Sequence, residues 1–549
     1  MAAGLSNAEL DAIAVYLNGK APTHAATSPA DMGDVLACRT VSPPATRGPR
    51  WNGWSPTSDN ARFQRDTSLK VSDVSRLRVK WAFAFAGGVG GQPSIVGDRV
   101  YLGTGAGLVY ALDARTGCAY WHAQVAASGI RAAVTVGRLV GALGGSGRLA
   151  VFVGDRSAGV HALDAATGRE IWSAKADTHP LATITGSPTL YRGRIYVPVS
   201  STESAATLSR NYRCCTFRGS VVAVDASNGR KLWQSFTITQ TPKPYRLAPD
   251  GQRLWGPAGA AIWSAPTVDV RRGVLYAGSG NAYSDAPSTG SDAVMAIGLI
   301  SGKVRWRRQL TANDTYMVGC TGQPNQPSAC PRIVGPDHDV GNSPILRTLP
   351  NGRSILLVAQ KSGMVTALDP DRGGAMLWQR RLSQGSALGG IEWGMAADRS
   401  RLFVPIADPY TRRSQTKAGL YAVRIRDGSL IWSTPAPYPD CRIAPKGSLV
   451  GMCTSGLSAA ATATPGLVFE GSMDGILRAY DARDGKIRGR LDIGQSIFRP
   501  VNAPAGIKGD TINGAGATVA GGTLYQISGY QPINRSAVNL LLAFTIDGK

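Results

Sequence analysis

The sequence predicts an all-β protein, an eight-bladed β-propeller, and three observations carry this prediction. A short motif recurs eight times along the 549 residues. Glycine is abundant, at 67 residues, and the many apolar runs are short, which favours strands and turns over long helices. Near the N-terminus, the isolated strand pattern RLRVKWAFAFA supplies a strand that the last copy of the motif lacks.

The repeat is clearest in VYALDARTGCAYW, VHALDAATGREIW and VVAVDASNGRKLW, which end at Trp121, Trp172 and Trp233. Each copy reads as an alternating strand, an Asp/Gly turn and a second short strand ending in tryptophan. Weaker copies end at Trp306, Trp378 and Trp432, and the last two copies lack the tryptophan. We expect each tryptophan to dock on the neighbouring blade, where a large side chain can be buried.

The spacing of the copies identifies the architecture. The alanine before each turn recurs every 51 to 73 residues, a period typical of propeller blades with four short strands. It stands at Ala111, Ala162, Ala223, Ala296, Ala367, Ala422, Ala479 and Ala543. The chain ends at Lys549, before the tryptophan that the last copy requires. We therefore expect the strand around Trp81 to complete the last blade, which closes the ring and removes a free sheet edge.

A different region precedes the propeller. LSNAELDAIAVYLNG predicts a helix that Ser6 caps and Glu9 completes as a capping box. Its apolar face consists of Leu10, Ile13, Ala14 and Leu17. We expect residues 1–20 to form this helical segment, residues 21–50 to be a linker rich in Pro, Ala and Thr, and residues 51–549 to form the propeller.

The chain is strongly basic, with 59 Lys and Arg against 36 Asp and Glu, a formal charge of +23. Such a balance suits nucleic acid, an anionic surface or an acidic protein partner. The charges are scattered, however, and no nucleic-acid-binding motif occurs, so a solvated basic surface is favoured over a nucleic-acid partner. No run of about 18 apolar residues occurs, so no membrane span is expected.

Eight cysteines indicate disulfides and an oxidising compartment. Cys320 and Cys330 bracket one loop, as Cys441 and Cys453 do another, and we expect both pairs to be bonded. The remaining cysteines are the adjacent Cys214 and Cys215, with Cys38 and Cys118 left by elimination. Zinc ligation is the alternative, but no CxxC pair exists. The chain opens without a signal-peptide pattern, which conflicts with the cysteines.

Spacing alone offers few catalytic motifs. The sequence contains no CxxCH, no Walker loop and no HExxH. In GPDHDVGNSP, Asp337 and Asp339 flank His338, which by itself is more typical of a polar loop than of a site.

Taken together, ordered segments across residues 50–549 resemble the pyrroloquinoline quinone (PQQ) dehydrogenases, and most closely their polyvinyl alcohol dehydrogenase branch. These segments include WNGWSPTSDNARFQ, RCCTFRGSVVAVD, IWSAPTVDVRRGVLYAGSGNAYSD, GPDHDVGNSPIL and FEGSMDGILRAYDARDGK. The resemblance implies a propeller of the quinoprotein type. It also makes the helix of residues 1–20 similar to the last helix of a cytochrome c domain. Because CxxCH is absent, no covalent haem is expected in this chain, and a truncated N-terminus would explain both that loss and the missing signal peptide.

The resemblance implies roles for residues at matching positions. Trp263 would form the floor under the flat quinone. Thr185 and Ser200 would form hydrogen bonds with PQQ, and Lys361 would form hydrogen bonds with the quinone oxygens. Arg156 and Trp393 would belong to the same pocket. Glu203 and Asn281 would be the calcium ligands. Asp339 would be the general base and could also approach the metal. Some of these assignments have a structural alternative. Trp263 could be an ordinary core residue, Thr185 and Ser200 could be strand hydroxyls that face solvent, and Asn281 could belong to a structural turn. The adjacent cysteines depart from the methanol-type relatives, which place theirs in an earlier blade, so a vicinal disulfide beside the quinone is not implied.

The expected function is therefore a periplasmic PQQ- and Ca²⁺-dependent dehydrogenase. It would oxidise alcohols, secondary alcohols such as polyvinyl alcohol among them, and pass electrons to a cytochrome c. Asp339 would accept the alcohol proton while PQQ takes the hydride. Two alternatives remain: a non-catalytic propeller scaffold for periplasmic protein–protein interaction, and a truncated pseudo-enzyme. A scaffold gives no reason for Glu203, Asn281, Asp339, Trp263 and Lys361 to occur together.

Overall fold

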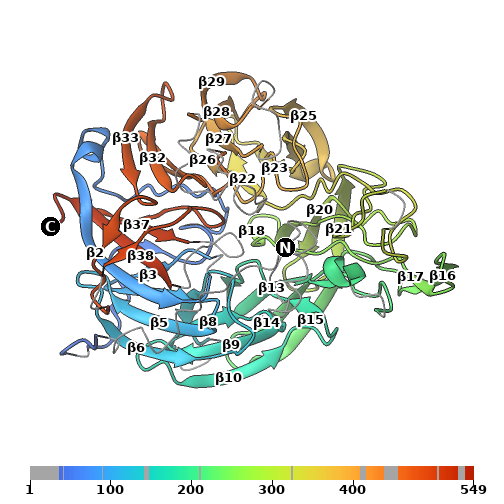
Figure 1. Cartoon of the computed structure of the whole chain (residues 1–549), viewed down its shortest axis with the longest axis horizontal. Coiled ribbons are helices and arrows are strands. Elements are labelled where there is room, and N and C mark those ends of the chain that lie inside the picture. The colour runs from blue at the N-terminus through green and yellow to red at the C-terminus, as the bar shows by residue number, and fades with distance from the viewer. Residues whose placement is uncertain are drawn as a thin grey trace.

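Eight antiparallel sheets surround one central axis in the computed structural model, and each sheet is a propeller blade (Figure 1). The structure describes residues 36–40, 42–88, 91–140, 147–208, 212–322, 326–408, 416–437, 456–503, 506–529 and 538–549. Within these residues the eight-bladed propeller predicted from the repeat is confirmed. The predicted helix of residues 1–20 lies outside them and stays a prediction.

Each blade is a meander of four strands, counted from the axis outward. Blade 1 contains β3 (Ser94–Val96), β4 (Arg99–Gly103), β5 (Leu108–Asp113) and β6 (Ala119–Gln124), with β1 (Arg50–Trp51) on its inner edge. Blade 2 contains β7 (Thr135–Arg138), β8 (Leu149–Gly154), β9 (Gly159–Asp164) and β10 (Glu170–Lys175). Blade 3 contains β12 (Thr189–Tyr191), β13 (Arg194–Ser201), β14 (Ser220–Asp225) and β15 (Lys231–Phe236), with β11 (Ala182–Thr183) also paired to β13. Blade 4 contains β18 (Thr267–Asp269), β19 (Val274–Gly278), β20 (Ala293–Gly298) and β21 (Val304–Gln309).

The second half of the ring repeats this plan. Blade 5 contains β22 (Ile345–Thr348), β23 (Ser354–Ala359), β24 (Met364–Asp369) and β25 (Ala375–Arg381). Blade 6 contains β26 (Ala396–Ala397), β27 (Arg401–Ile406), β28 (Gly419–Arg424) and β29 (Leu430–Pro435). Blade 7 contains β30 (Thr462–Thr464), β31 (Leu467–Gly471), β32 (Ile476–Asp481) and β33 (Ile487–Asp492). Blade 8 contains β36 (Thr518–Ala520), β37 (Thr523–Ser528), β38 (Val538–Ile546) and β2 (Leu77–Ala86).

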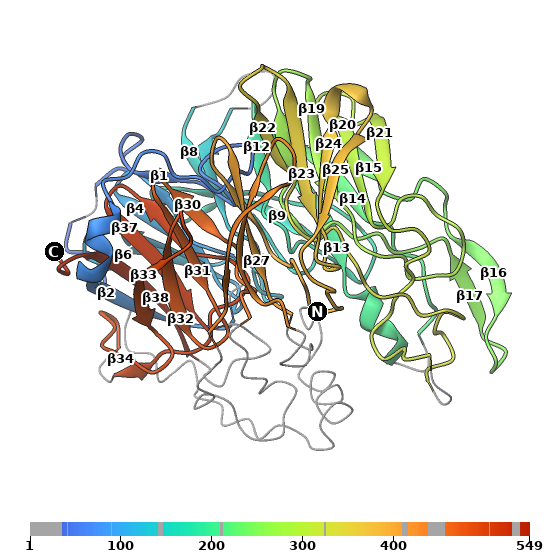
Figure 2. The same cartoon turned by 90° about the horizontal axis from the view of Figure 1, so that it is seen from above.

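Short additional elements lie in the loops between strands. They are the hairpin β16 (Lys243–Leu247) with β17 (Arg253–Gly256), the hairpin β34 (Ile497–Phe498) with β35 (Ile507–Lys508), and the 3-10 turns η2 (Val71–Arg76), η3 (Glu203–Leu208) and η4 (Pro370–Arg372). Figure 2 shows β16 and β17 projecting away from the ring. No helix among the described residues is long and apolar enough to cross a membrane.

The N-terminal strand closes the ring. β2 pairs antiparallel with β38, and Trp81 stands opposite Ala543, as Trp121 stands opposite Ala111 in blade 1 (Figure 1). The prediction for Trp81 is therefore confirmed. Because the last blade takes its outer strand from the start of the chain, the two ends of the propeller are tied together by a full strand ladder.

The repeated tryptophans join neighbouring blades. Trp81 Nε1 donates to the carbonyl of Ala114 at 3.1 Å, and its ring lies against Gly117 in the next blade. A Cβ at Gly117 would lie 2.8 Å from the indole, and its φ of 76° also favours glycine. The same packing recurs for Trp121 on Gly168, Trp172 on Gly229, Trp233 on Gly302, Trp306 on Gly374, Trp378 on Gly428 and Trp432 on Gly485. In these seven pairs the turn glycine leaves room for the tryptophan ring of the preceding blade.

Blade 7 replaces this contact by another. Gly489 stands opposite Ala479, where the other copies carry tryptophan. A Cβ at Gly489 would lie 2.2 Å from Cγ1 of Val74, which belongs to η2 and is buried. The segment that leads into β2 therefore fills the position that the motif leaves vacant in this blade.

Residues 52–68 bind the inner edges of several blades before the chain enters η2. Gly53 N donates to Ser94 Oγ, Asn60 Nδ2 to Thr267 Oγ1 at 2.8 Å, and Arg62 Nε to the carbonyl of Ala461 at 2.8 Å. Inner strands expose backbone groups toward the axis, so partners there satisfy what would otherwise be a buried, unpaired edge. This segment brings Trp54 to the axis.

Three disulfides occur among the described residues. Cys320–Cys330 is bonded, as expected, and so is Cys38–Cys118, the pair left by elimination. The adjacent Cys214 and Cys215 also form a disulfide. Cys441 and Cys453 lie outside the described residues, so their pairing stays a prediction.

Candidate active site

The candidate site lies at one end of the ring, where two loop positions of each blade are found. One position precedes the innermost strand, and the other follows the second strand; because the strands are antiparallel, both lie at the same end of the ring. Trp263 precedes β18 and Asn281 follows β19. Asp339 precedes β22 and Lys361 follows β23 in the next blade. The meander therefore brings side chains that are far apart in sequence to one end of the axis.

Lys361 joins two buried carboxyl groups. Its Nζ lies 2.7 Å from Asp339 Oδ2 and 3.0 Å from Asp337 Oδ2. All three side chains are almost fully buried, so the ammonium needs these partners. Burial raises the pKa of Asp337 to about 8, although Lys361 opposes this shift. Burial by itself lowers the pKa of Lys361, but Asp337 and Asp339 outweigh it and raise that pKa above its ordinary value. Burial therefore favours the protonated form of Asp337, and the two carboxyl groups favour the charged form of Lys361.

Asn281 contacts the same carboxylate. Its backbone N donates to Asp339 Oδ1 at 2.7 Å, and its Nδ2 donates to the carbonyls of Ala282 and Tyr316, each at 2.7 Å. Since both amide hydrogens are engaged, the orientation of the amide is fixed, and no described donor bonds its Oδ1. An amide oxygen presented in this way is a ligand of the kind that hard cations prefer.

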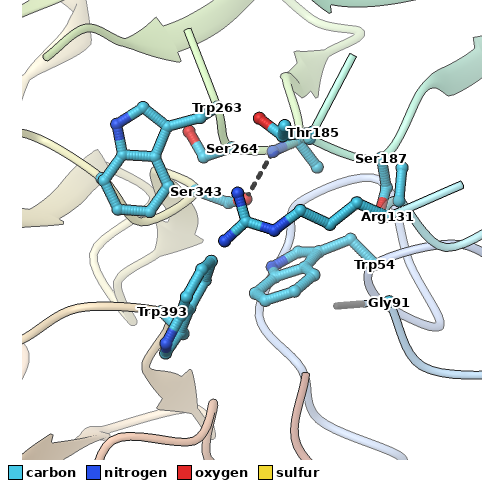
Figure 3. A pocket seen from close by; sticks show the side chains of 13 residues that line it. Trp54, Gly91, Arg131, Thr185, Ser187, Trp263, Ser264, Ser343 and Trp393 are labelled. Carbon is cyan, nitrogen blue, oxygen red and sulfur yellow. Dashed lines mark hydrogen bonds between the residues drawn. The ribbon is translucent and has the colours of Figure 1, made fainter. Parts of the chain in front are cut away.

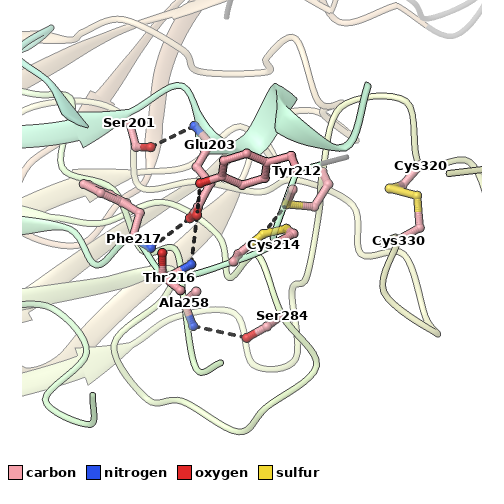
Figure 4. Close-up of a disulfide and its surroundings, with 12 residues drawn as sticks. Ser201, Glu203, Tyr212, Cys214, Thr216, Phe217, Ala258, Ser284, Cys320 and Cys330 are labelled. Carbon is pink, nitrogen blue, oxygen red and sulfur yellow. Dashed lines mark hydrogen bonds between the residues drawn. A yellow bond between two sulfur atoms is a disulfide. The ribbon is translucent and has the colours of Figure 1, made fainter. Parts of the chain in front are cut away.

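The carboxylate of Glu203 points at the loop that contains Tyr212, Thr216 and Phe217 (Figure 4). This fully buried carboxylate accepts from Tyr212 Oη at 2.7 Å, from Thr216 N at 2.8 Å and from Phe217 N at 2.9 Å. The donors come from the loop that contains the Cys214–Cys215 disulfide. His179 Nε2 also lies 3.7 Å from Glu203 Oε1.

Tyr283 follows Asn281 by two residues and is buried. Burial raises the pKa of its phenol, and the charges of Asp339 and then Glu203 raise it further. The convergence of Glu203, Asn281 and Asp339 on one cation stays a prediction. In the structure the carboxylate of Glu203 contacts Tyr212, Thr216, Phe217 and His179.

A narrow cavity of about 20 Å³ lies at the axis (Figure 3). Trp263 and Trp393 border it with their ring centroids 5.5 Å apart and their planes at 77°. Trp263 rests on Gly341, where a Cβ would lie 2.0 Å from the indole. Lys361 Nζ is 5.6 Å from the centroid of Trp263. The cavity wall and the Lys361 cluster therefore share this one indole.

The polar groups of the cavity fit a flat anionic cofactor. The hydroxyls of Thr185 and Ser264 are buried and have no partner among the described residues. The guanidinium of Arg131 reaches in among Trp54, Trp263 and Trp393, 4.7 Å from the centroid of Trp393 (Figure 3). PQQ is a planar tricyclic quinone with carboxylates, so an indole face, unpaired hydroxyls and a guanidinium suit it.

The structure separates the sequence-predicted cofactor residues into two groups. Thr185, Trp263 and Trp393 line the cavity. Ser200 and Arg156 are not among its lining residues. Ser200 of β13 pairs with Thr183 of β11. Arg156 lies in the loop after β8, and its backbone N donates to the carbonyl of Gly129.

Sequence reasoning missed Arg131 and Trp54. Arg131 stands four residues before the inner strand of its blade, as do Thr185, Trp263 and Gly341 in theirs. All four line the cavity, because the chain reaches it at that position in these four blades. The repeated motif lies in the later strands of each blade, but this shared position before the inner strand could have identified Arg131. Trp54 comes from the segment before the ring and carries no repeat signal.

Known proteins match the chain over its whole length. The family model described as "Glucose/ethanol/alcohol dehydrogenase, beta-propeller domain" matches residues 51–326, and one described as "Outer membrane protein assembly factor BamB" matches residues 361–488. A polyvinylalcohol dehydrogenase from Pseudomonas sp is 42% identical and covers 100% of this chain and 87% of its own length. A second, from Sphingopyxis sp. (strain 113P3), is 41% identical over 94% of this chain and 80% of its own length.

Solved structures agree on the fold. The quinohemoprotein alcohol dehydrogenase from Comamonas testosteroni superposes with a TM-score of 0.63 at 17% identity, covering 91% of this chain and 81% of that one. At that identity the likeness concerns architecture alone, whereas the sequence matches concern descent. From these matches and the propeller with its axial site, this chain is an oxidoreductase that belongs to the PQQ-dependent alcohol dehydrogenase family.

Proposed function

We propose that this protein is a PQQ- and Ca²⁺-dependent dehydrogenase that oxidises secondary alcohols, polyvinyl alcohol among them. The observation that carries the proposal is the contact of Asp339 with both Asn281 and Lys361 beside the indole of Trp263. Two relatives with 42% and 41% identity are named for polyvinyl alcohol, which supports that substrate.

Residues of the cavity would hold the cofactor. Trp263 offers the flat face, the hydroxyl of Thr185 a hydrogen-bonding group, and Arg131 a charge for a carboxylate. When bound, PQQ supplies a two-electron acceptor that takes the hydride of the alcohol. Lys361 keeps a positive charge at the same place, which stabilises negative charge that develops on a nearby oxygen.

The cation would lie between Asn281, Glu203 and Asp339. Asn281 presents its Oδ1, and Glu203 and Asp339 supply carboxylate oxygens, which together form the hard donor set that Ca²⁺ prefers. Asp339 is also the residue placed to receive the alcohol proton. A positioned carboxylate beside the cofactor cavity is the group that can act as this general base.

Electrons would pass on to a cytochrome c in the periplasm. The formal charge of +23 would speed association with an acidic partner, and the rate would fall as salt is added. A cytochrome of neutral or basic surface would show no such dependence.

Reconstitution tests the proposal. Purified protein is titrated with PQQ in the presence of Ca²⁺ while tryptophan fluorescence is followed, since Trp263 and Trp393 border the cavity. Dye-linked turnover is then measured on primary, secondary and polymeric alcohols. We expect quenching that saturates at one PQQ per chain and the highest kcat/KM on secondary and polymeric alcohols. Saturable PQQ binding without turnover on any alcohol would refute the proposed reaction, and the absence of PQQ binding would refute the cofactor.

A further inference from the structure

We propose that Asp314 is a positioning residue that sets the place of Asp339. Asp314 precedes the Cys320–Cys330 loop between β21 and β22 and contacts neither Asp339 nor the cavity wall. The role assigned to Asp339 rests on the proposed function, whereas the contacts of Asp314 do not.

The carboxylate of Asp314 holds the turn that leads to Asp339. Its Oδ1 accepts the backbone N–H of Asp337 at 3.1 Å, and its Oδ2 accepts that of His338 at 2.6 Å. Asp337 has a φ of 59°, in the left-handed region that a non-glycine residue adopts only with support. Two charge-assisted bonds to successive N–H groups supply such support. The turn they hold presents Asp337 and Asp339 to the same Lys361 Nζ.

The segment that follows Asp314 also bonds the two other loops of the site. The carbonyl of Tyr316 accepts from Asn281 Nδ2 at 2.7 Å. Val318 N donates to the carbonyl of Ser204, the residue after Glu203, at 2.8 Å. Residues 314–318 therefore link the loops of Glu203, Asn281 and Asp339, which come from three different blades.

The burial of Asp314 argues against a role in stability alone. Only 1% of its surface is exposed, and burial raises its pKa, while the N–H groups of His338 and Asp337 lower it. No described basic side chain pairs with it. Burying a carboxylate without a cation costs free energy that an apolar residue would not. What the carboxylate adds is the fixed geometry of two N–H groups beside Asp339.

The test compares Asp314→Asn with a matched control, Asp398→Asn. Asp398 is also buried and also accepts two successive N–H groups, those of Ser400 and Arg401, but in the turn between β26 and β27 at the opposite end of the ring. Unlike Asp314, it is also paired with the guanidinium of Arg401, at 2.6 Å. In the full-length apoprotein, hydrogen exchange is followed by mass spectrometry for a peptide covering residues 335–342. We expect at least about tenfold faster exchange in this peptide for Asp314→Asn, and wild-type exchange there for Asp398→Asn.

The second readout is kinetic. After loading with PQQ and Ca²⁺, Asp314→Asn should lose about 30- to 100-fold in kcat, with KM and PQQ affinity within about threefold of wild type, because a displaced base impairs the chemical step. Wild-type exchange in the peptide, or loosened exchange with wild-type kcat, would overturn the proposal. If the loaded wild-type protein is itself inactive, the proposed function fails, and the exchange data alone decide whether Asp314 holds the turn. Asp314→Glu, which keeps the charge but moves it by one methylene, serves for both readouts if Asp314→Asn does not fold.

Discussion

Asp337 and Asp339 flank one lysine, yet exchanging each for asparagine should have very different effects. Burial raises the pKa of Asp337 to about 8, which favours its protonated form at pH 7. Asparagine has the shape of a protonated carboxyl and can still accept from Lys361 with its oxygen. Asp337→Asn should therefore keep kcat/KM within about threefold of wild type at pH 7.

Asp339→Asn should be severe. Its two oxygens face two donors, the ammonium of Lys361 at 2.7 Å and the N–H of Asn281 at 2.7 Å, so an amide would turn its NH₂ toward one of them. Such a mismatch costs about 1–3 kcal/mol of stability. The amide also cannot take the alcohol proton, and loss of a general base lowers the rate by about 10²–10⁴, equivalent to about 3–5 kcal/mol in the barrier.

The assay is dye-linked turnover of a secondary alcohol at saturating PQQ and Ca²⁺, with the folded fraction checked by circular dichroism. Thermal midpoints of the apoproteins between pH 5 and 8.5 add an independent arm. The folded-state pKa of Asp337 lies above its ordinary value, so its contribution to stability is complete at acid pH and is lost as the pH rises through about 8. Asp337→Asn lacks this loss and should gain in midpoint relative to wild type as the pH rises. Equal loss of activity in the two variants would refute the division of roles between Asp337 and Asp339.

Three other changes test the fold and the site. Trp81→Ala removes a buried indole and its bond to Ala114, and should lower the free energy of unfolding by about 3–5 kcal/mol in urea titrations; an unchanged midpoint would contradict closure of the ring by β2. Glu203→Gln places an NH₂ where the carboxylate now accepts three donors, so Ca²⁺ affinity in isothermal titration should fall and excess Ca²⁺ should partly restore turnover; unchanged affinity would remove Glu203 from the ligand set. Gly341→Ala puts a Cβ 2.0 Å from the present position of the Trp263 ring. PQQ affinity should therefore fall at least about tenfold in fluorescence titration, although no polar group is lost. Wild-type affinity would show that Trp263 is not the floor of the cofactor site.

The sequence by itself determined the architecture of this protein. The Ala–Asp–Gly–Trp repeat has a local cause, since each tryptophan needs a glycine turn in the next blade, and local chemistry of this kind recurs visibly along a chain. Closure by the strand of Trp81 followed from the same count, because a blade that lacks a strand leaves an open edge. Resemblance to a family then placed Asp339, Lys361, Asn281 and Trp263 in one site.

Only the tertiary structure decided which side chains meet at the axis and with what partners. Arg131 lines the cavity from the position before an inner strand, and Trp54 lines it from the segment that precedes the ring and carries no repeat. The hydrogen bonds of Glu203 and the hold of Asp314 on the turn of Asp337 join residues of loops whose lengths differ from blade to blade. Such loops contain no repeated pattern. Their contacts form only once eight blades have closed around a common axis. The partners of the site residues therefore could not be predicted from the sequence along with the residues themselves.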